Sequence, residues 1–166
     1  EQTTIDGRDA HLRQAVLVSR IGIFDHDHLT DTVYWSPQQR ETYGWDPDET
    51  VTMPAFLACV YPEDRERIAD AVRRAHDPAG DGVFDVEHRI IRRDGSIRWL
   101  DTRSQTFFQG EGGARHPVRT VGATAEAALA TAFDVAGVGA SSGLLFLASC
   151  ALAEVRRMAE KSQSAM

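Results

Sequence analysis

Apolar residues recur three and four positions apart in two segments of the chain, which is the spacing of one face of a helix. The first segment covers residues 9–19, and Asp9 is placed to cap its start. The second covers residues 62–76, where two acidic residues at the beginning lie against the positive end of the helix. We therefore expect a short helix near the N-terminus and a longer one in the middle of the chain.

Other segments show the patterns of strands, in which apolar and polar residues alternate or form short apolar runs. The predicted strands cover residues 21–26, 31–35, 83–92, 97–108 and 116–124. The third strand places one set of side chains on a single face: Phe84, Val86, His88 and Ile90. Asp94 and Gly95 form a strong hairpin signal after it, so the last three strands should make an antiparallel meander.

The segment between the second and third strands reads as short helices. Ser36 is a good N-cap, Pro37 suits the first helical position, and Gly44 can end that helix. Residues 46–61 are expected to be irregular with short helical turns. Two strands, several helices and a three-stranded meander predict an α+β fold rather than a parallel βαβ repeat.

The chain has 166 residues, which suits one domain with flanking segments. We divide it into an N-terminal flanking helix at 1–20, a core domain at 21–124 and a C-terminal helical segment at 125–166. Net charge is −7, with 25 acidic and 18 basic residues, which argues against nucleic acid as the main partner. The two cysteines, Cys59 and Cys150, form no CxxC pair, and a reducing cytoplasm fits this usage.

Residues 135–153 contain no charged side chain. Their length would suit a membrane span, but they are rich in Gly, Ala and Ser, which are weakly hydrophobic. We expect a helix that packs on the core or on a second copy of the chain, rather than one that crosses a membrane.

Short motifs in a fixed order between Ile21 and Thr124 resemble the PAS family, in particular its PAC-containing, third-type subgroup. The matching pieces are Gly22-Ile23-Phe24-Asp25, Tyr34-Trp35-Ser36-Pro37, Tyr43-Gly44-Trp45, Tyr61-Pro62-Glu63-Asp64-Arg65, Glu87-His88-Arg89-Ile90, Arg93-Asp94-Gly95-Ser96-Ile97-Arg98-Trp99 and Val121-Gly122. The resemblance implies a five-stranded antiparallel sheet with helices folded over one face. It also implies a pocket between them that holds a small ligand or is filled by side chains.

The resemblance further implies that the chain senses a signal and passes it to an output domain, as in bacterial sensor histidine kinases and diguanylate cyclases. We found no catalytic motif in the chain, so we do not expect it to be an enzyme. From strand alternation and the resemblance, we predict a mainly apolar pocket. Its candidate lining residues are Phe24, Tyr43, Phe56, Ile68, Val72, Val86, His88 and Trp99.

No cofactor is predicted, although an unidentified small ligand fits the resemblance. Flavin-binding relatives carry a cysteine within an Asn-Cys-Arg-Phe-Leu motif, which is missing here; Cys59 lies in an apolar setting. Haem-binding relatives use a histidine on the long helix, and the only one here, His76, lies at the helix end, where the dipole favours a cation. Two alternatives stay open: a haem or other cofactor-binding sensor, and an interaction module with no ligand.

Two further groups of polar residues are better explained by structure than by chemistry. His26 and His28 have the spacing of a metal pair, but such a site needs further ligands and none can be named, so we predict a surface loop and no metal. Glu87 and Arg89 are expected to form a surface ion pair.

The flanking helices are the expected route of assembly and output. The C-terminal segment carries more apolar residues than a lone exposed helix would, among them Leu144 to Leu147 and Leu152. We therefore predict a cytoplasmic homodimer held by at least one flanking helix and linked to an output domain or partner protein.

Overall fold

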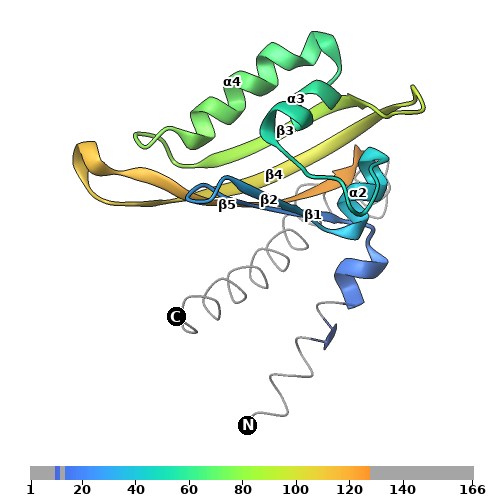
Figure 1. The fold of residues 1–166 in the computed structure, drawn as a ribbon, viewed down its shortest axis with the longest axis horizontal. Helices are drawn as coiled ribbons and strands as arrows, with labels where there is room; N and C mark the ends of the chain where they lie inside the picture. Colours follow the sequence, from blue (N-terminus) through green and yellow to red (C-terminus); the bar gives the residue numbers. More distant parts are fainter. Residues whose placement is uncertain (1–9, 12–13, 128–166) are drawn as a thin grey trace, which may run out of the picture.

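The computed structural model describes residues 10–11 and 14–127. Five strands form one antiparallel sheet in the order β2-β1-β5-β4-β3, and the helices of the core lie over one of its faces (Figure 1). The strands are β1 (Gly22–Asp27), β2 (Thr32–Trp35), β3 (Val83–Ile91), β4 (Ile97–Gln109) and β5 (His116–Glu126). The predicted α+β fold and its five antiparallel strands are confirmed.

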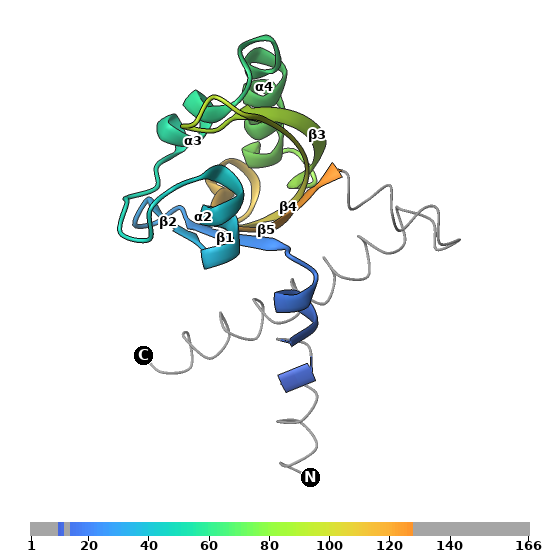
Figure 2. The same cartoon turned by 90° about the vertical axis from the view of Figure 1, so that its right-hand side faces the viewer.

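Three α-helices connect the two halves of the sheet. They are α2 (Pro37–Tyr43), α3 (Met53–Cys59) and α4 (Arg65–His76), with short 3-10 turns η1 (Pro62–Asp64) and η2 (Gly112–Ala114). The Ser36 hydroxyl accepts a hydrogen bond from the backbone N–H of Gln39, and Gly44, at φ 72°, ends α2 in the left-handed conformation. The sheet curves, and these helices lie on its concave side (Figure 2).

The flanking segments are described only in part. Residues 14–18 are helical, in agreement with the helix expected at 9–19. The C-terminal segment beyond residue 127, including the uncharged stretch 135–153, lies outside the described residues. Within the described part of the chain, no helix combines the length and the apolar character needed to cross a membrane.

The β3–β4 hairpin decides which side chains face the helices. Arg92 and Ser96 close the turn, and the pairing then sets His88 opposite Leu100 and Arg89 opposite Trp99. Phe84, Val86, His88 and Ile90 share the inner face, as predicted, but Trp99 does not join them: it lies on the outer face and is 51 % exposed. The prediction that Trp99 packs into the pocket was wrong by one position, because Leu100 occupies the inward site opposite His88.

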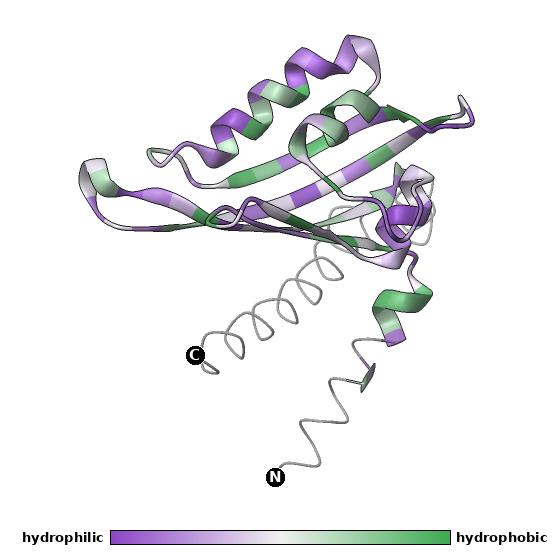
Figure 3. Cartoon of the chain, viewed as in Figure 1, coloured by the Kyte–Doolittle hydropathy of each residue, from purple (hydrophilic) through white to green (hydrophobic). Residues whose placement is uncertain are grey.

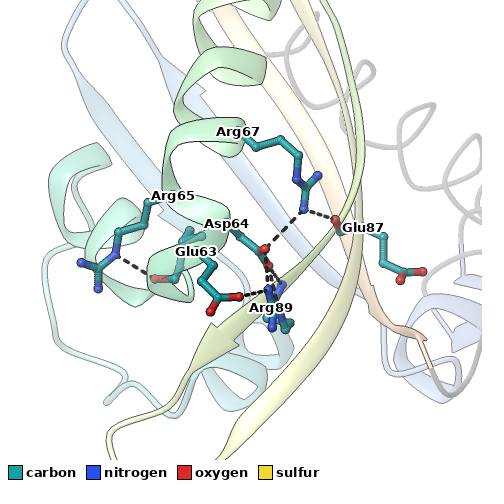
Figure 4. Close-up of polar contacts among 7 residues, drawn as sticks. Glu63, Asp64, Arg65, Arg67, Glu87 and Arg89 are labelled. Carbon is teal, nitrogen blue, oxygen red and sulfur yellow. Dashed lines mark hydrogen bonds and ion pairs between the residues drawn. The ribbon is translucent and has the colours of Figure 1, made fainter.

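A polar clamp joins the start of α4 to β3 (Figure 4). Asp64 accepts hydrogen bonds from the backbone N–H of Arg89 at 2.9 Å and from its guanidinium at 3.1 and 2.8 Å. Arg67, on the next turn, donates to the backbone carbonyl of Glu87 at 2.9 Å. The expected surface pair of Glu87 with Arg89 was therefore wrong: Arg89 turns to the buried carboxylate of Asp64, which also receives its backbone N–H.

The polar clamp changes the pKa of Asp64. The hydrogen bonds from Arg89 lower the pKa of Asp64 to about 2. A carboxylate whose pKa is depressed in the folded state stabilises the fold above its unfolded pKa, near 4, and this contribution is lost as the pH falls through about 2.

We expect Asp64→Asn to lower the free energy of unfolding at pH 7 by about 1–3 kcal/mol, because a charge-assisted contact is lost. The difference from wild type should shrink between pH 4 and pH 2, and urea unfolding at several pH values measures it. Glu63→Gln is the matched control, since its contact with Arg89 is exposed and 3.4 Å long, and it should change little. A constant difference across the acid range would contradict this account.

Candidate functional site

A cavity of about 60 Å³ lies between the inner face of the sheet and the helices. It holds a few water molecules at most, well below the roughly 300–1,000 Å³ of typical small-molecule sites. A haem or a flavin would fit only if the helices moved. The lining residues come from all five strands, from α2, α3 and α4, and from the loop before α3. They are Phe24, His26, Val33, Trp35, Gln39, Tyr43, Val51, Thr52, Met53, Phe56, Val72, Ala75, His76, Phe84, Thr102, Ser104, Thr120 and Thr124.

Aromatic rings form the apolar wall of the cavity. The ring centroids of Trp35 and Tyr43 are 4.5 Å apart, and those of Tyr43 and Phe56 are 6.3 Å apart. Burial raises the pKa of Tyr43, so its hydroxyl stays protonated. This wall is apolar, and it gives a ligand contact area but little polar recognition.

A hydrogen-bonded row of side chains forms the polar wall. The Gln39 amide donates to Thr124 at 3.3 Å, Thr124 bonds Thr102 at 3.3 Å, and Thr102 bonds His88 Nε2 at 3.1 Å. The row therefore runs from α2 across β5 and β4 to β3. All four side chains are buried, so each lost contact would leave a polar group without water.

Among the described residues, each end of this row keeps one buried polar atom that makes no hydrogen bond. These atoms are Gln39 Oε1 and His88 Nδ1. Buried polar atoms are nearly always paired, so two at the ends of one row point to a missing partner such as a ligand or an ordered water. Gly22 makes room for the amide, since a Cβ there would lie 2.1 Å from Gln39 Oε1.

His88 faces inward, as its strand alternation predicted. The His88 ring meets the Phe56 ring edge-on, with 6.3 Å between the ring centroids. Burial lowers the pKa of His88 to about 4. The imidazole is therefore neutral near pH 7 and offers one donor and one acceptor. His88 itself does not line the cavity; it reaches it through Thr102, which does.

Three histidines meet at the other end of the cavity. The ring centroids of His26 and His28 are 4.1 Å apart, and those of His28 and His76 are 4.6 Å apart. The prediction of a surface loop was wrong for His26, which lies in β1, is only 6 % exposed and contacts His76 at the end of α4, whereas His28 does lie in the turn after β1. The helix dipole favours a cation at His76, but burial acts in the opposite direction and lowers its pKa.

The eight predicted pocket residues fall into three groups. Phe24, Tyr43, Phe56 and Val72 line the cavity. Ile68 and Val86 pack in the neighbouring core under α4, and His88 joins the polar row. Trp99 lies on the opposite face, where its ring is 5.2 Å from the Arg89 guanidinium. A ligand-binding role for the members of the set that face inward stays a prediction.

Sequence reasoning missed most of the polar lining. Thr102, Ser104 and Thr106 occupy alternate positions on β4 and all face inward. Hydroxyl residues at period two on a strand were the available signal, but they read equally well as a solvated face. Cys59, at the end of α3, packs against the aromatic core, and burial raises the pKa of its thiol.

Comparisons with known proteins agree with this geometry. A family model described as PAS fold matches residues 32–123, more than half of the chain. The sensor protein FixL of Bradyrhizobium diazoefficiens is 31% identical over 111 residues, which are 67% of this chain and 22% of that protein. A blue-light-activated histidine kinase of Brucella ovis is 33% identical over 92 residues, 55% of this chain and 18% of that protein. The chain thus spans about a fifth of the length of these curated relatives.

Solved structures show the same fold. A sensory box histidine kinase/response regulator from Burkholderia thailandensis superposes with a TM-score of 0.56 and 28% identity, over 69% of this chain and 82% of that one. The N-terminal domain of a diguanylate cyclase with PAS/PAC sensor from Marinobacter aquaeolei gives 0.53 at 16% identity, over 66% and 96%, and this likeness concerns the fold alone.

We expect Thr124→Val to lower the free energy of unfolding by about 1–3 kcal/mol, since it leaves the buried Gln39 amide and Thr102 hydroxyl without their shared partner. Thr124→Ser keeps the hydroxyl and should cost clearly less. Urea denaturation of both variants measures the difference. Equal losses would mean that packing of the methyl group, and not the polar row, stabilises this part of the sheet.

Proposed function

The chain belongs to the PAS family of signal-sensing modules, and we propose that it is the sensory part of a larger bacterial signalling protein of the sensor histidine kinase type. In this proposal a small molecule occupies the cavity on the inner face of the sheet. The matched family is a sensory module rather than a catalytic one. The kinase or other output activity would reside in a part of the protein beyond this chain, and a cytoplasmic location follows from the same proposal.

The observation that carries the proposal is the pair of unpaired buried atoms at the ends of the polar row. Gln39 Oε1 is an acceptor only, so its partner must be a donor. His88 Nδ1 is a donor or an acceptor according to the tautomer. The aromatic wall opposite favours an apolar body. We therefore propose a small uncharged ligand with at least one N–H or O–H group.

A route to the output segment starts in the same row. Thr124 lies near the end of β5, three residues before the last described residue, and β5 lies in the middle of the sheet between β1 and β4. A ligand that binds Gln39 changes the hydrogen bonds of Thr124 directly, and one that binds His88 changes them through Thr102. The strand that leads to the C-terminal segment thereby receives the signal without a relay through loops.

Two other functions are distinguished by simple observations. A relative is described as blue-light-activated, and a flavin or haem bound to this chain would give a visible absorption band. An interaction module with a filled cavity would bind no small molecule. Native mass spectrometry of the purified chain separates these outcomes.

We expect a panel of small metabolites to contain a compound that raises the melting temperature of the wild-type chain. Ser104→Met places a larger side chain in the cavity and should weaken binding of that compound at least tenfold. Arg103→Met is the matched control. Arg103 is the neighbour of Ser104 on β4, and its side chain lies on the other face of the sheet, in a surface ion pair with Asp85. If Ser104→Met leaves binding unchanged, the ligand binds outside the cavity. If no compound binds and native mass spectrometry shows the chain without any bound molecule, the interaction module is favoured.

We also propose that the chain forms a homodimer through its flanking helices. Leu17 and Val18 are 76 % and 84 % exposed, on an apolar helical turn that stands away from the sheet (Figure 3). Exposed apolar side chains at adjacent positions favour a partner surface. The rest of the predicted interface, in the C-terminal segment, lies outside the described residues.

Sedimentation of the full chain should show a dimer at tens of micromolar, and the double variant Leu17→Glu, Val18→Glu should shift it toward monomer. Ile97→Glu, an exposed apolar position on the β3–β4 hairpin, is the control and should leave the dimer intact. A chain ending at Glu126 tests the C-terminal contribution. A monomeric full chain, or a dimer unchanged by both the double variant and the truncation, would contradict the proposal.

A further inference from the structure

The three histidines at the end of the cavity come from parts of the chain that are far apart in sequence. His26 is the inward residue near the end of β1, His28 follows in the turn, and His76 is the last residue of α4. Each offers a ring nitrogen, and these three atoms all lie within 4.8 Å of one another. The fold thus assembles a group of ligands that strand spacing alone could not complete.

The contacts around the cluster orient its rings. Asp31 accepts a hydrogen bond from His26 Nε2 at 2.9 Å. Because a carboxylate can only accept, this bond leaves Nδ1 of the neutral His26 ring with the lone pair. A carboxylate on the outer nitrogen of a histidine is also the usual support for a metal ligand.

The other two rings converge on one point. Nε2 of His28 lies 2.8 Å from Thr120 Oγ1, and Nε2 of His76 lies 3.5 Å from the same atom. Both nitrogens thus lie beside the Thr120 hydroxyl at the edge of the cavity, which His26, His76 and Thr120 all line. A ligand bound there would be in reach of the cavity.

From this geometry we propose that His26, His28 and His76 bind one divalent transition-metal ion of the zinc class, with the remaining coordination position turned toward the cavity. Imidazole nitrogen is a preferred ligand of Zn²⁺, and three protein ligands with one open position make a site that accepts an exogenous ligand. Zinc–nitrogen bonds of roughly 2.0–2.1 Å space the nitrogens about 3.3 Å apart, so the rings close in on the ion. Two of the three rings stand at or beyond the end of a regular element, since His28 lies in a turn and His76 is the last residue of α4.

The tautomer of His26 suits this role. A metal ligand must be a neutral imidazole. Asp31 accepts a hydrogen bond from His26 Nε2, and this leaves a lone pair on Nδ1 of His26 for a bond to the metal. The alternative is a purely structural cluster, in which the three rings pack together and bond only Asp31 and Thr120.

The test uses the full chain without an affinity tag, treated with a chelator and then dialysed. Zn²⁺ titrated by calorimetry should bind at one ion per chain, and Co²⁺ should give visible d–d bands typical of a low-coordinate nitrogen site. Zn²⁺ should also raise the melting temperature, since the ion would join β1, the following turn and α4.

Each of His26→Gln, His28→Gln and His76→Gln should weaken Zn²⁺ binding at least tenfold and abolish the Co²⁺ bands. The control is His116→Gln, an exposed histidine at the start of β5 that bonds the carbonyl of Ala114, and it should bind as wild type does. His28→Gln decides the matter if the variant at buried His26 fails to fold, as judged by circular dichroism. The proposal is overturned if wild type binds no Zn²⁺ in the micromolar range, or if His28→Gln and His76→Gln bind it as wild type does.

Discussion

The ion pair between Asp64 and Arg89 determines where the long helix lies on the sheet. Asp64 stands in the N-cap position just before α4, but its side chain makes no capping hydrogen bond; its carboxylate instead accepts three hydrogen bonds from one residue of β3. The carboxylate binds both the backbone N–H and the guanidinium of Arg89, so the contact sets both the position and the direction of the start of α4 on the sheet. With the start of α4 anchored, its apolar face covers Phe84, and its last residue, His76, reaches β1.

A second constraint follows from the inner face that α4 covers. Three inward positions of β4 and two of β5 carry hydroxyl groups, so this core must satisfy polar atoms as well as exclude water. Most of these groups pair with one another across the strands, and threonine pairs suit this because their methyl groups still fill space. Gln39 Oε1 and His88 Nδ1 are the exceptions, because neither atom makes a hydrogen bond within the described residues. Such a cost is expected at a binding site rather than in a purely structural core.

The sequence predicted several of the apolar residues that line the cavity but not its polar residues. Phe24, Tyr43, Phe56 and Val72 were found because aromatic and branched residues at helical or strand spacing point to a shared core. Gln39 was missed because a glutamine in the middle of a short helix reads as exposed. Trp99 was misplaced because the face of β4 depends on its register with β3, and a hairpin turn leaves that register open by one residue until the pairing is known.

The sequence by itself determined the order of the elements, the five-stranded antiparallel sheet and the family. The elements follow from local periodicity, caps and turns, which involve residues near one another in the chain, and the family follows from the resemblance of short motifs in a fixed order. Only the tertiary structure decided which polar groups meet. His26 and His28 lie about fifty residues before His76, and Gln39 lies 85 residues before Thr124, so no local pattern connects them. They come together because the central strands pair β1 with β5 and because α4 is held across the same sheet.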